Sequence, residues 1–250
     1  IAYATFKILE KNKNANMIVA PSDHLITQED LFIKVVNQCL KTTETENCLV
    51  TLGITPTRPD TGYGYIQFSN QKLSINSKAK KVKTFTEKPN QELALQFIDS
   101  GDFSWNSGIF IWKAEEIQLA IRKYLRDLYD FFESGKKYYN THEEQDFIER
   151  IFPLCKNISI DYGIMEKAEN VYVVNTEFGW SDLGTWGSLY THLKKDDNDN
   201  AVNGSGVALY NSQANIINLP NKTVIIEGLE GYIVVEKNNT LLICKRDSEQ

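Results

Sequence analysis

Apolar and polar positions at the start of the chain alternate between helical and strand spacing. Residues 1–11 carry apolar side chains along one side of a helix, and residues 16–20 form a short apolar run typical of a buried strand. The same order returns with a helical pattern over 29–42 and a strand over 48–53. Helices that alternate with buried strands predict an α/β fold, in which crossover helices connect the strands of a parallel sheet.

The middle of the chain departs from this alternation. Residues 65–68 and 82–87 are expected to be strands with no helix between them, so the sheet should become mixed. Residues 115–132 have apolar positions at helical spacing and predict one long helix. The remaining elements expected here are helices over 91–100, 143–151 and 185–195, strands over 108–112 and 172–175, and a polar turn over 134–139.

The final part of the chain has the pattern of a separate, smaller unit. The interval 194–200 is charged and rich in Asn, and it is expected to be a solvated linker. We therefore predict one domain over 1–195 and a second over 196–250. Short apolar runs separated by Asn and Gly turns predict a small all-β unit, similar to the start of a β-helix. These runs are 206–210, 214–219, 223–227, 231–236 and 240–245.

Composition and charge narrow the class of protein. The chain has 250 residues, 42% of them hydrophobic, which suffices for one substantial core and a small second unit. Its net charge is −6 and its Lys and Arg residues are dispersed, so we expect no nucleic-acid partner. No apolar run reaches the roughly 20 residues that cross a bilayer, and no signal-peptide pattern is present, so we expect no membrane partner and a cytoplasmic location. Four cysteines without CxxC spacing are expected to be reduced and mostly buried.

Two aspartates stand alone in turns that are far apart in the sequence. Asp23 follows the apolar run Ile18-Val19-Ala20-Pro21, and Asp182 lies in the turn Trp180-Ser181-Asp182-Leu183-Gly184. A carboxylate that follows a strand should stand at the carboxyl edge of the sheet, where open α/β sheets bind ligands. Magnesium prefers one or two carboxylates together with phosphate oxygens, which this pair would supply. Either aspartate alone has a second interpretation as a helix cap or turn residue, and His24 is expected to be structural or to orient a metal ligand.

Three further motifs between these aspartates combine backbone access with polar side chains. The loop Gly62-Tyr63-Gly64 lets backbone N–H groups approach a sugar hydroxyl or a phosphate closely. Glu87-Lys88-Pro89 ends a strand with a carboxylate suited to vicinal hydroxyls and an ammonium suited to a phosphate, although a surface ion pair is an equal alternative. Asn106 adds an amide at the start of a strand. The tryptophans are expected to pack rather than to stack on a ligand: Trp105, Trp112, Trp180 and Trp186.

The five motifs, in this order, resemble those of the sugar 1-phosphate nucleotidyltransferases, and within them the bacterial mannose-1-phosphate guanylyltransferases. The resemblance implies a Rossmann-like mixed sheet followed by a small β domain. It also implies that Asp23 and Asp182 hold Mg²⁺ at the catalytic centre and that Lys88 meets the sugar phosphate there. The residues implied to bind the substrate are Gly62, Tyr63, Gly64, Glu87, Lys88, Asn106 and Asp161.

Asp161 comes from the segment Ser159-Ile160-Asp161-Tyr162-Gly163-Ile164-Met165-Glu166, which is similar to a segment that precedes the second metal acid in this family. The resemblance implies that Asp161 helps to shape the sugar pocket. An N-cap at Asp161, on a helix with Glu166 at its surface, is an equal alternative. Gly163 stands where family members usually have a small residue such as alanine.

The activity implied by the resemblance is attack of a mannose 1-phosphate oxygen on the α-phosphorus of GTP, which releases pyrophosphate and leaves GDP-mannose. GTP and mannose 1-phosphate are then the expected partners, and a homodimer is allowed. Two alternatives stay open. One is nucleotidyl transfer to another sugar 1-phosphate, such as glucose 1-phosphate, and the other is a non-catalytic regulatory subunit that binds sugar nucleotides.

Members of this family also carry a Gly-rich loop, with an Arg and a Pro-Lys pair, that wraps the triphosphate after their first strand. The sequence from Ile1 onward contains no such segment. We therefore expect this chain by itself to bind mannose 1-phosphate weakly and to transfer GMP negligibly, because preorganised donors of this kind contribute about 10²- to 10³-fold each.

Overall fold

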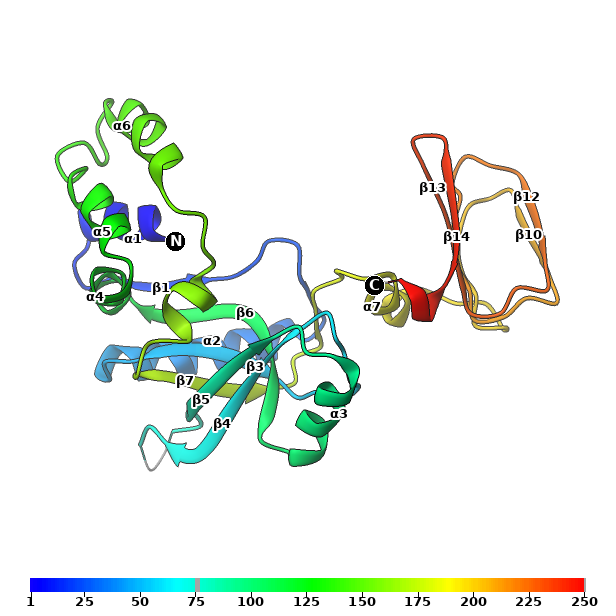
Figure 1. Cartoon of the computed structure of the whole chain (residues 1–250), viewed down its shortest axis with the longest axis horizontal. Coiled ribbons are helices and arrows are strands. Elements are labelled where there is room, and N and C mark those ends of the chain that lie inside the picture. Colours follow the sequence, from blue (N-terminus) through cyan, green and yellow to red (C-terminus); the bar gives the residue numbers. More distant parts are fainter. Residues whose placement is uncertain (75–76, 250) are drawn as a thin grey trace. The chain divides into compact units, whose positions relative to one another are not determined.

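A computed structural model describes residues 1–74 and 77–249, which divide into two compact units (Figure 1). The first unit comprises Ile1–Ser22 and Ile26–Trp180. The second comprises Asp23–Leu25 and the described residues from Ser181 onward. Each unit has its own hydrophobic core.

A six-stranded mixed sheet forms the centre of the first unit, with strand order β1-β6-β3-β7-β5-β4. Strands β3 and β7 are parallel, whereas the other neighbouring strands are antiparallel, as the sequence pattern predicts. Strand β4 also pairs with the first residues of β6. Every residue of β3 is buried, which explains its continuous apolar sequence. The strands are β1 (Asn16–Val19), β3 (Leu49–Ile54), β4 (Gly64–Lys72), β5 (Lys80–Glu87), β6 (Phe103–Lys113) and β7 (Val171–Thr176).

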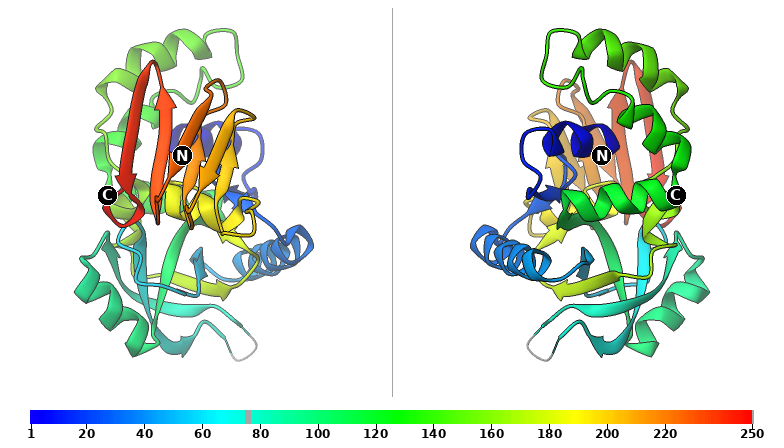
Figure 2. Two further views of the ribbon diagram at one scale, coloured as in Figure 1. Left: turned by 90° about the vertical axis from the view of Figure 1, so that its right-hand side faces the viewer. Right: turned by 90° about the vertical axis from the view of Figure 1, so that its left-hand side faces the viewer.

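Helices of the first unit pack against this sheet and against one another. Helix α2 contacts β3 and β6, and α1 lies beside α4 and α5 (Figures 1 and 2). Helix α3 begins where the Asn90 side chain accepts a hydrogen bond from Leu93 N, and it ends at Gly101, whose φ of 69° suits glycine. The helices are α1 (Ala2–Leu9), α2 (Glu29–Thr45), α3 (Gln91–Ser100), α4 (Ala114–Tyr124), α5 (Arg126–Glu133) and α6 (Glu144–Ile151).

The prediction of one long helix over 115–132 is wrong, because the helix is interrupted between α4 and α5. Leu125 leaves the helical conformation, with φ −134° and ψ 58°. Its side chain packs over Gly163, where a Cβ would lie 3.1 Å from Leu125 Cδ1. The periodicity of apolar positions continues through this interruption. The sequence pattern therefore could not predict where the helix is interrupted. The expected burial of the tryptophans is confirmed for Trp105, Trp112 and Trp180.

A buried carboxylate joins α6 to α1. Glu144 is 7% exposed and accepts hydrogen bonds from Tyr3 Oη, Lys7 Nζ and Asn140 N. Burial opposes its charge, but these three hydrogen bonds outweigh burial and lower the pKa of Glu144 to about 2. The ionised carboxylate of Glu144 therefore stabilises the attachment of α6 to α1.

The second unit is a coil of short strands, as its sequence pattern predicts. Strands β9, β11 and β13 pair in parallel, β14 adds to β13 antiparallel, and β10 and β12 form a separate parallel pair (Figure 2). Parallel pairing of successive turns is typical of a solenoid. Its elements are α7 (Trp186–His192), β9 (Ala201–Asn203), β10 (Val207–Tyr210), β11 (Ile216–Asn218), β12 (Val224–Glu227), β13 (Tyr232–Lys237), β14 (Thr240–Lys245) and the 3₁₀ turn η3 (Arg246–Ser248).

The interval 194–200 is mostly exposed, as its composition predicts, but its last residue, Asn200, is buried. Asn200 is 1% exposed, and its Oδ1 accepts a hydrogen bond from Nδ2 of Asn215 at 2.9 Å. Asn215 Oδ1 in turn accepts from Tyr232 N at 2.8 Å. These two buried amides satisfy backbone groups at one corner of the coil, so Asn200 and Asn215 are structural. The helix expected over 185–195 is also shorter, since α7 ends at His192.

Candidate functional site

The start of β4 and the end of β5 bring Gly64 beside Glu87. These two residues are register partners in the antiparallel pair. A Cβ on Gly64 would lie 2.6 Å from Glu87 Oε2 and 3.5 Å from Asn106 Cβ, so a side chain at this position would require the Glu87 carboxylate to turn away. The backbone of Gly64 therefore lies directly against the Glu87 carboxylate in a polar cluster.

Strand β6 and the π-helical turn η2 (Asp161–Met165) complete this cluster. Asn106 Nδ2 donates to Asp161 Oδ1 at 2.9 Å, and Asn106 Oδ1 accepts from Gly108 N at 3.2 Å. The amide nitrogen and the amide oxygen of Asn106 are thus both hydrogen-bonded, and these bonds set the orientation of the amide. Four residues singled out from the sequence, namely Gly64, Glu87, Asn106 and Asp161, are brought together in the first unit.

Negative charge concentrates in this cluster. Desolvation raises the pKa of Glu87, and the nearby charges of Asp161 and Glu166 raise it further, while Lys88 opposes them. Desolvation also raises the pKa of Asp161, although the hydrogen bond from Asn106 counteracts it. Glu166 has a raised pKa as well, from desolvation and from Asp161. The site therefore contains three neighbouring carboxylates beside one ammonium, an arrangement suited to accepting hydrogen bonds from hydroxyl groups.

Glu166 was not singled out from the sequence as a site residue. In an α-helix, residues five positions apart point about 140° away from each other, which would place Glu166 on the opposite side of the helix from Asp161. Here Glu166 N donates to Asp161 O at 2.9 Å, and this wider turn brings the two acids to the same region. No sequence signal announces a π-helical turn, so Glu166 could only be found in the structure.

Gly62 and Tyr63 occupy different places from Gly64. Gly62 N donates to Asp60 Oδ1 at 2.9 Å, inside the loop that precedes β4. The Tyr63 ring is 6% exposed and packs edge-on against Trp105 and Trp180, at 5.0 and 5.3 Å between ring centroids. Lys88 follows β5 with a φ of 46°, a left-handed conformation that is uncommon for a residue with a side chain. Such local strain is often retained where a side chain must be aimed.

Asp23 and Asp182 both belong to the second unit. Two short strands, β2 (Leu25–Ile26) and β8 (Trp180–Ser181), pair with each other, so the segments that carry the two aspartates run side by side. Asp182 Oδ1 accepts a hydrogen bond from Gly184 N at 2.9 Å. Asp23 is exposed and His24 is half-buried.

Asp23 and Asp182 both carry carboxylates, the type of ligand that magnesium takes together with phosphate oxygens. Within residues 1–74 and 77–249, no group of three or more His, Cys, Asp or Glu side chains is arranged to hold a metal ion. A complete protein cage is thus not built there. Magnesium usually takes one or two carboxylates and fills its remaining positions with water and phosphate oxygens, and two hard oxygen ligands suit that role.

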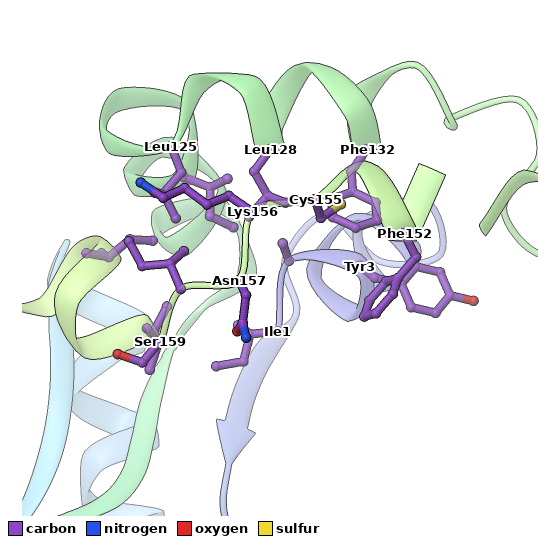
Figure 3. Close-up of a pocket in the computed structure, with 15 residues that line it drawn as sticks. Ile1, Tyr3, Leu125, Leu128, Phe132, Phe152, Cys155, Lys156, Asn157 and Ser159 are labelled. Atoms are coloured by element: carbon purple, nitrogen blue, oxygen red, sulfur yellow. The ribbon is translucent and has the colours of Figure 1, made fainter. Parts of the chain in front are cut away.

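A hollow of about 470 Å³ lies elsewhere in the first unit, between helices α4 and α5 and the segment 152–160 (Figure 3). Its labelled lining includes Leu125, Leu128, Phe132 and Phe152, so its walls are largely apolar. None of the candidate catalytic, metal-binding or substrate-binding residues lines it. The chemistry of the Gly64 cluster, rather than the size of this hollow, identifies the candidate site.

The chain belongs to the nucleotidyl transferase family, because the profile of that family matches residues 1–199. It is 33% identical over its whole length to a mannose-1-phosphate guanylyltransferase of Escherichia coli and 36% identical to one of Salmonella montevideo. It spans 54% and 53% of those proteins, about half of their length.

A solved structure also matches across both units. It is described as a mannose-1-phosphate geranyltransferase from Thermus thermophilus, with a TM-score of 0.82 and 27% sequence identity over 98% of this chain and 70% of that one. The fold class predicted from the sequence is therefore confirmed, as is membership of the family. No helix among the described residues is both long and apolar enough to cross a membrane.

Proposed function

We propose that the protein carrying this chain transfers GMP from GTP to mannose 1-phosphate, giving GDP-mannose and pyrophosphate. The observation that carries the proposal is the convergence of Gly64, Glu87, Asn106 and Asp161 in one cluster. The names of the similar proteins support mannose 1-phosphate as the acceptor.

The cluster would bind the sugar by its hydroxyl groups. Glu87 and Asp161 offer carboxylate oxygens, which accept hydrogen bonds, and Asn106 offers an N–H group whose direction is set by its bonds to Asp161 and Gly108. Lys88, directly after β5, would meet the phosphate. Gly64 would let the sugar approach the backbone, since no side chain fills that position.

The proposed reaction needs little acid–base catalysis. An oxygen of mannose 1-phosphate is already an anion, and it would form the new bond to the α-phosphorus while the bond to the bridging oxygen of pyrophosphate breaks. The protein would contribute by aligning the two phosphates and by offsetting their charge. Asp23 and Asp182 would hold Mg²⁺, which supplies charge neutralisation when bound.

An assay of pyrophosphate release tests the proposal. The whole protein that contains this chain is supplied with GTP, Mg²⁺ and mannose 1-phosphate, and glucose 1-phosphate is the acceptor in a parallel reaction. We expect release that depends on mannose 1-phosphate and that falls at least tenfold in Asn106→Ala, for loss of a hydrogen bond to a charged group. Faster release with glucose 1-phosphate would assign a different sugar. Absence of release with either sugar would favour a non-catalytic binding subunit.

A further inference from the structure

The first turn of α7 is held by a side chain from far along the chain. Gly187 N donates to both carboxylate oxygens of Glu249, each at 3.1 Å. A Cβ on Gly187 would lie 2.7 Å from Glu249 Oε1, so the glycine is what permits this approach. A carboxylate at this end of a helix also meets the positive end of the helix dipole. Both residues belong to the second unit.

Arg246 holds the same helix from its side. Its guanidinium lies 3.8 Å from the centroid of the Tyr190 ring, and its Nη1 donates to Ala214 O at 3.0 Å. Tyr190 Oη donates to Asp199 O at 2.6 Å. Helix α7, of only seven residues, is thus fixed to the β coil at its first turn and at its middle. A helix this short has little stability of its own.

The turn just before α7 carries Asp182, and its backbone is strained. Leu183 has a φ of 51°, in the left-handed region that side chains disfavour. Thr185 caps the helix by accepting from Ser188 N at 3.0 Å, so the turn continues directly into the part of α7 that Glu249 holds. Strained conformations persist only where neighbouring structure imposes them.

We propose that Glu249 and Arg246 are positioning residues for Asp182. By anchoring α7 to the β coil, they impose the turn at Leu183 and so fix the direction of the Asp182 carboxylate. The β coil thereby helps to orient a ligand of the proposed metal site and is not only an appended domain. This inference rests on the proposed function, in which Asp182 is a metal ligand.

Binding of Mn²⁺ by the whole protein in the presence of mannose 1-phosphate, which supplies the phosphate oxygens, is followed by the electron paramagnetic resonance signal of free Mn²⁺ and tests the inference without any turnover. Asp182→Asn should abolish the binding that belongs to this site. Glu249→Ala and Gly187→Ala should each weaken it about three- to tenfold. Gly187→Ala is the sharper variant, because alanine would ordinarily favour a helix and yet here displaces the Glu249 carboxylate. Glu249→Gln, which keeps an acceptor oxygen, should recover most of the affinity.

Glu227→Ala is the matched control, since Glu227 is exposed on β12 of the same unit, and it should bind Mn²⁺ as the unaltered chain does. Hydrogen exchange of the folded variants should show faster exchange at Gly187 N in Glu249→Ala, which reports the lost contact directly. Unchanged Mn²⁺ affinity in Glu249→Ala and Gly187→Ala, with loss in Asp182→Asn, would overturn the inference and leave the proposed function intact. Binding unaffected by Asp182→Asn would overturn both.

Discussion

Asn106 and Asp161 are 55 positions apart in the sequence, yet Asn106 Nδ2 donates to Asp161 Oδ1 at 2.9 Å. The bond connects β6 to the π-helical turn and sets the orientation of the amide. If the pair acts on the sugar as one unit, Asn106→Ala and Asp161→Ala should each raise the KM for mannose 1-phosphate about tenfold or more. The double variant should raise it by less than the product of the two.

The control for this cycle is a similar pair at another place in the same unit. Gln67 Nε2 donates to Asp102 Oδ2, also at 2.9 Å. Gln67→Ala should leave the KM for mannose 1-phosphate unchanged. Fully multiplicative effects in the Asn106 and Asp161 cycle would show that the two side chains act independently.

Gly64→Ala should impair the site without unfolding the protein. The new Cβ would lie 2.6 Å from Glu87 Oε2, so the carboxylate must turn away from its present position. We expect a KM for mannose 1-phosphate raised at least tenfold, with an unchanged unfolding midpoint, measured by steady-state kinetics and by thermal unfolding. Gly101→Asn is the control, since a side chain there meets open space and Asn tolerates its φ of 69°. An unchanged KM in Gly64→Ala would remove Glu87 from the sugar site.

The pH dependence of sugar-phosphate use should report the three clustered acids. Glu87 must be ionised to accept hydrogen bonds from hydroxyl groups, and its raised pKa delays ionisation to higher pH than usual for Glu. The value of kcat/KM for mannose 1-phosphate should therefore increase as pH rises through that pKa. Glu166→Gln removes a charge that raises the pKa of Glu87, so its profile should move to lower pH. Glu169→Gln, exposed on the following turn, should keep the original profile, and a shift equal to that of Glu166→Gln would contradict the assignment.

Glu144→Gln should destabilise the fold in a pH-dependent way. The folded pKa of Glu144 is about 2, below its ordinary value of 4.5, so the ionised group stabilises the folded state above pH 4.5. That contribution is lost as pH falls from about 4.5 toward 2. We expect a free energy of unfolding lower by about 1 to 3 kcal/mol at pH 7, measured by denaturant titration, with a smaller difference near pH 3. The exposed neighbour Glu143 is the control, and Glu143→Gln should change little.

Much of the fold follows from sequence patterns because local periodicity is enough to place a helix or a strand. The buried run at residues 48–53 and the helical pattern at 29–42 are of this kind. The register that sets Gly64 opposite Glu87 cannot be predicted from local periodicity, because it depends on where two strands meet after folding. The break at Leu125 and the buried Asn200 likewise depend on neighbours such as Gly163 and Asn215.

The candidate site shows the same division. Glu87 and Asn106 were identified by motif, whereas the contribution of Glu166 arises from an unusual helical turn. The hydrogen bond from Gly187 N to Glu249 joins residues that are 62 positions apart. Motifs indicate which residues are candidates to bind a ligand. The residues that orient them are distributed through the chain and carry no local pattern.

Titration of the ¹⁵N-labelled chain with mannose 1-phosphate tests the central claim most directly, because it requires neither GTP nor metal. If the cluster binds the sugar phosphate, the amide signals of Gly64, Asn106 and Asp161 should shift and saturate together, and Asn106→Ala should weaken that response. Shifts confined to the apolar hollow beside Leu125 and Phe152, or saturable shifts that Asn106→Ala leaves unchanged, would contradict the account.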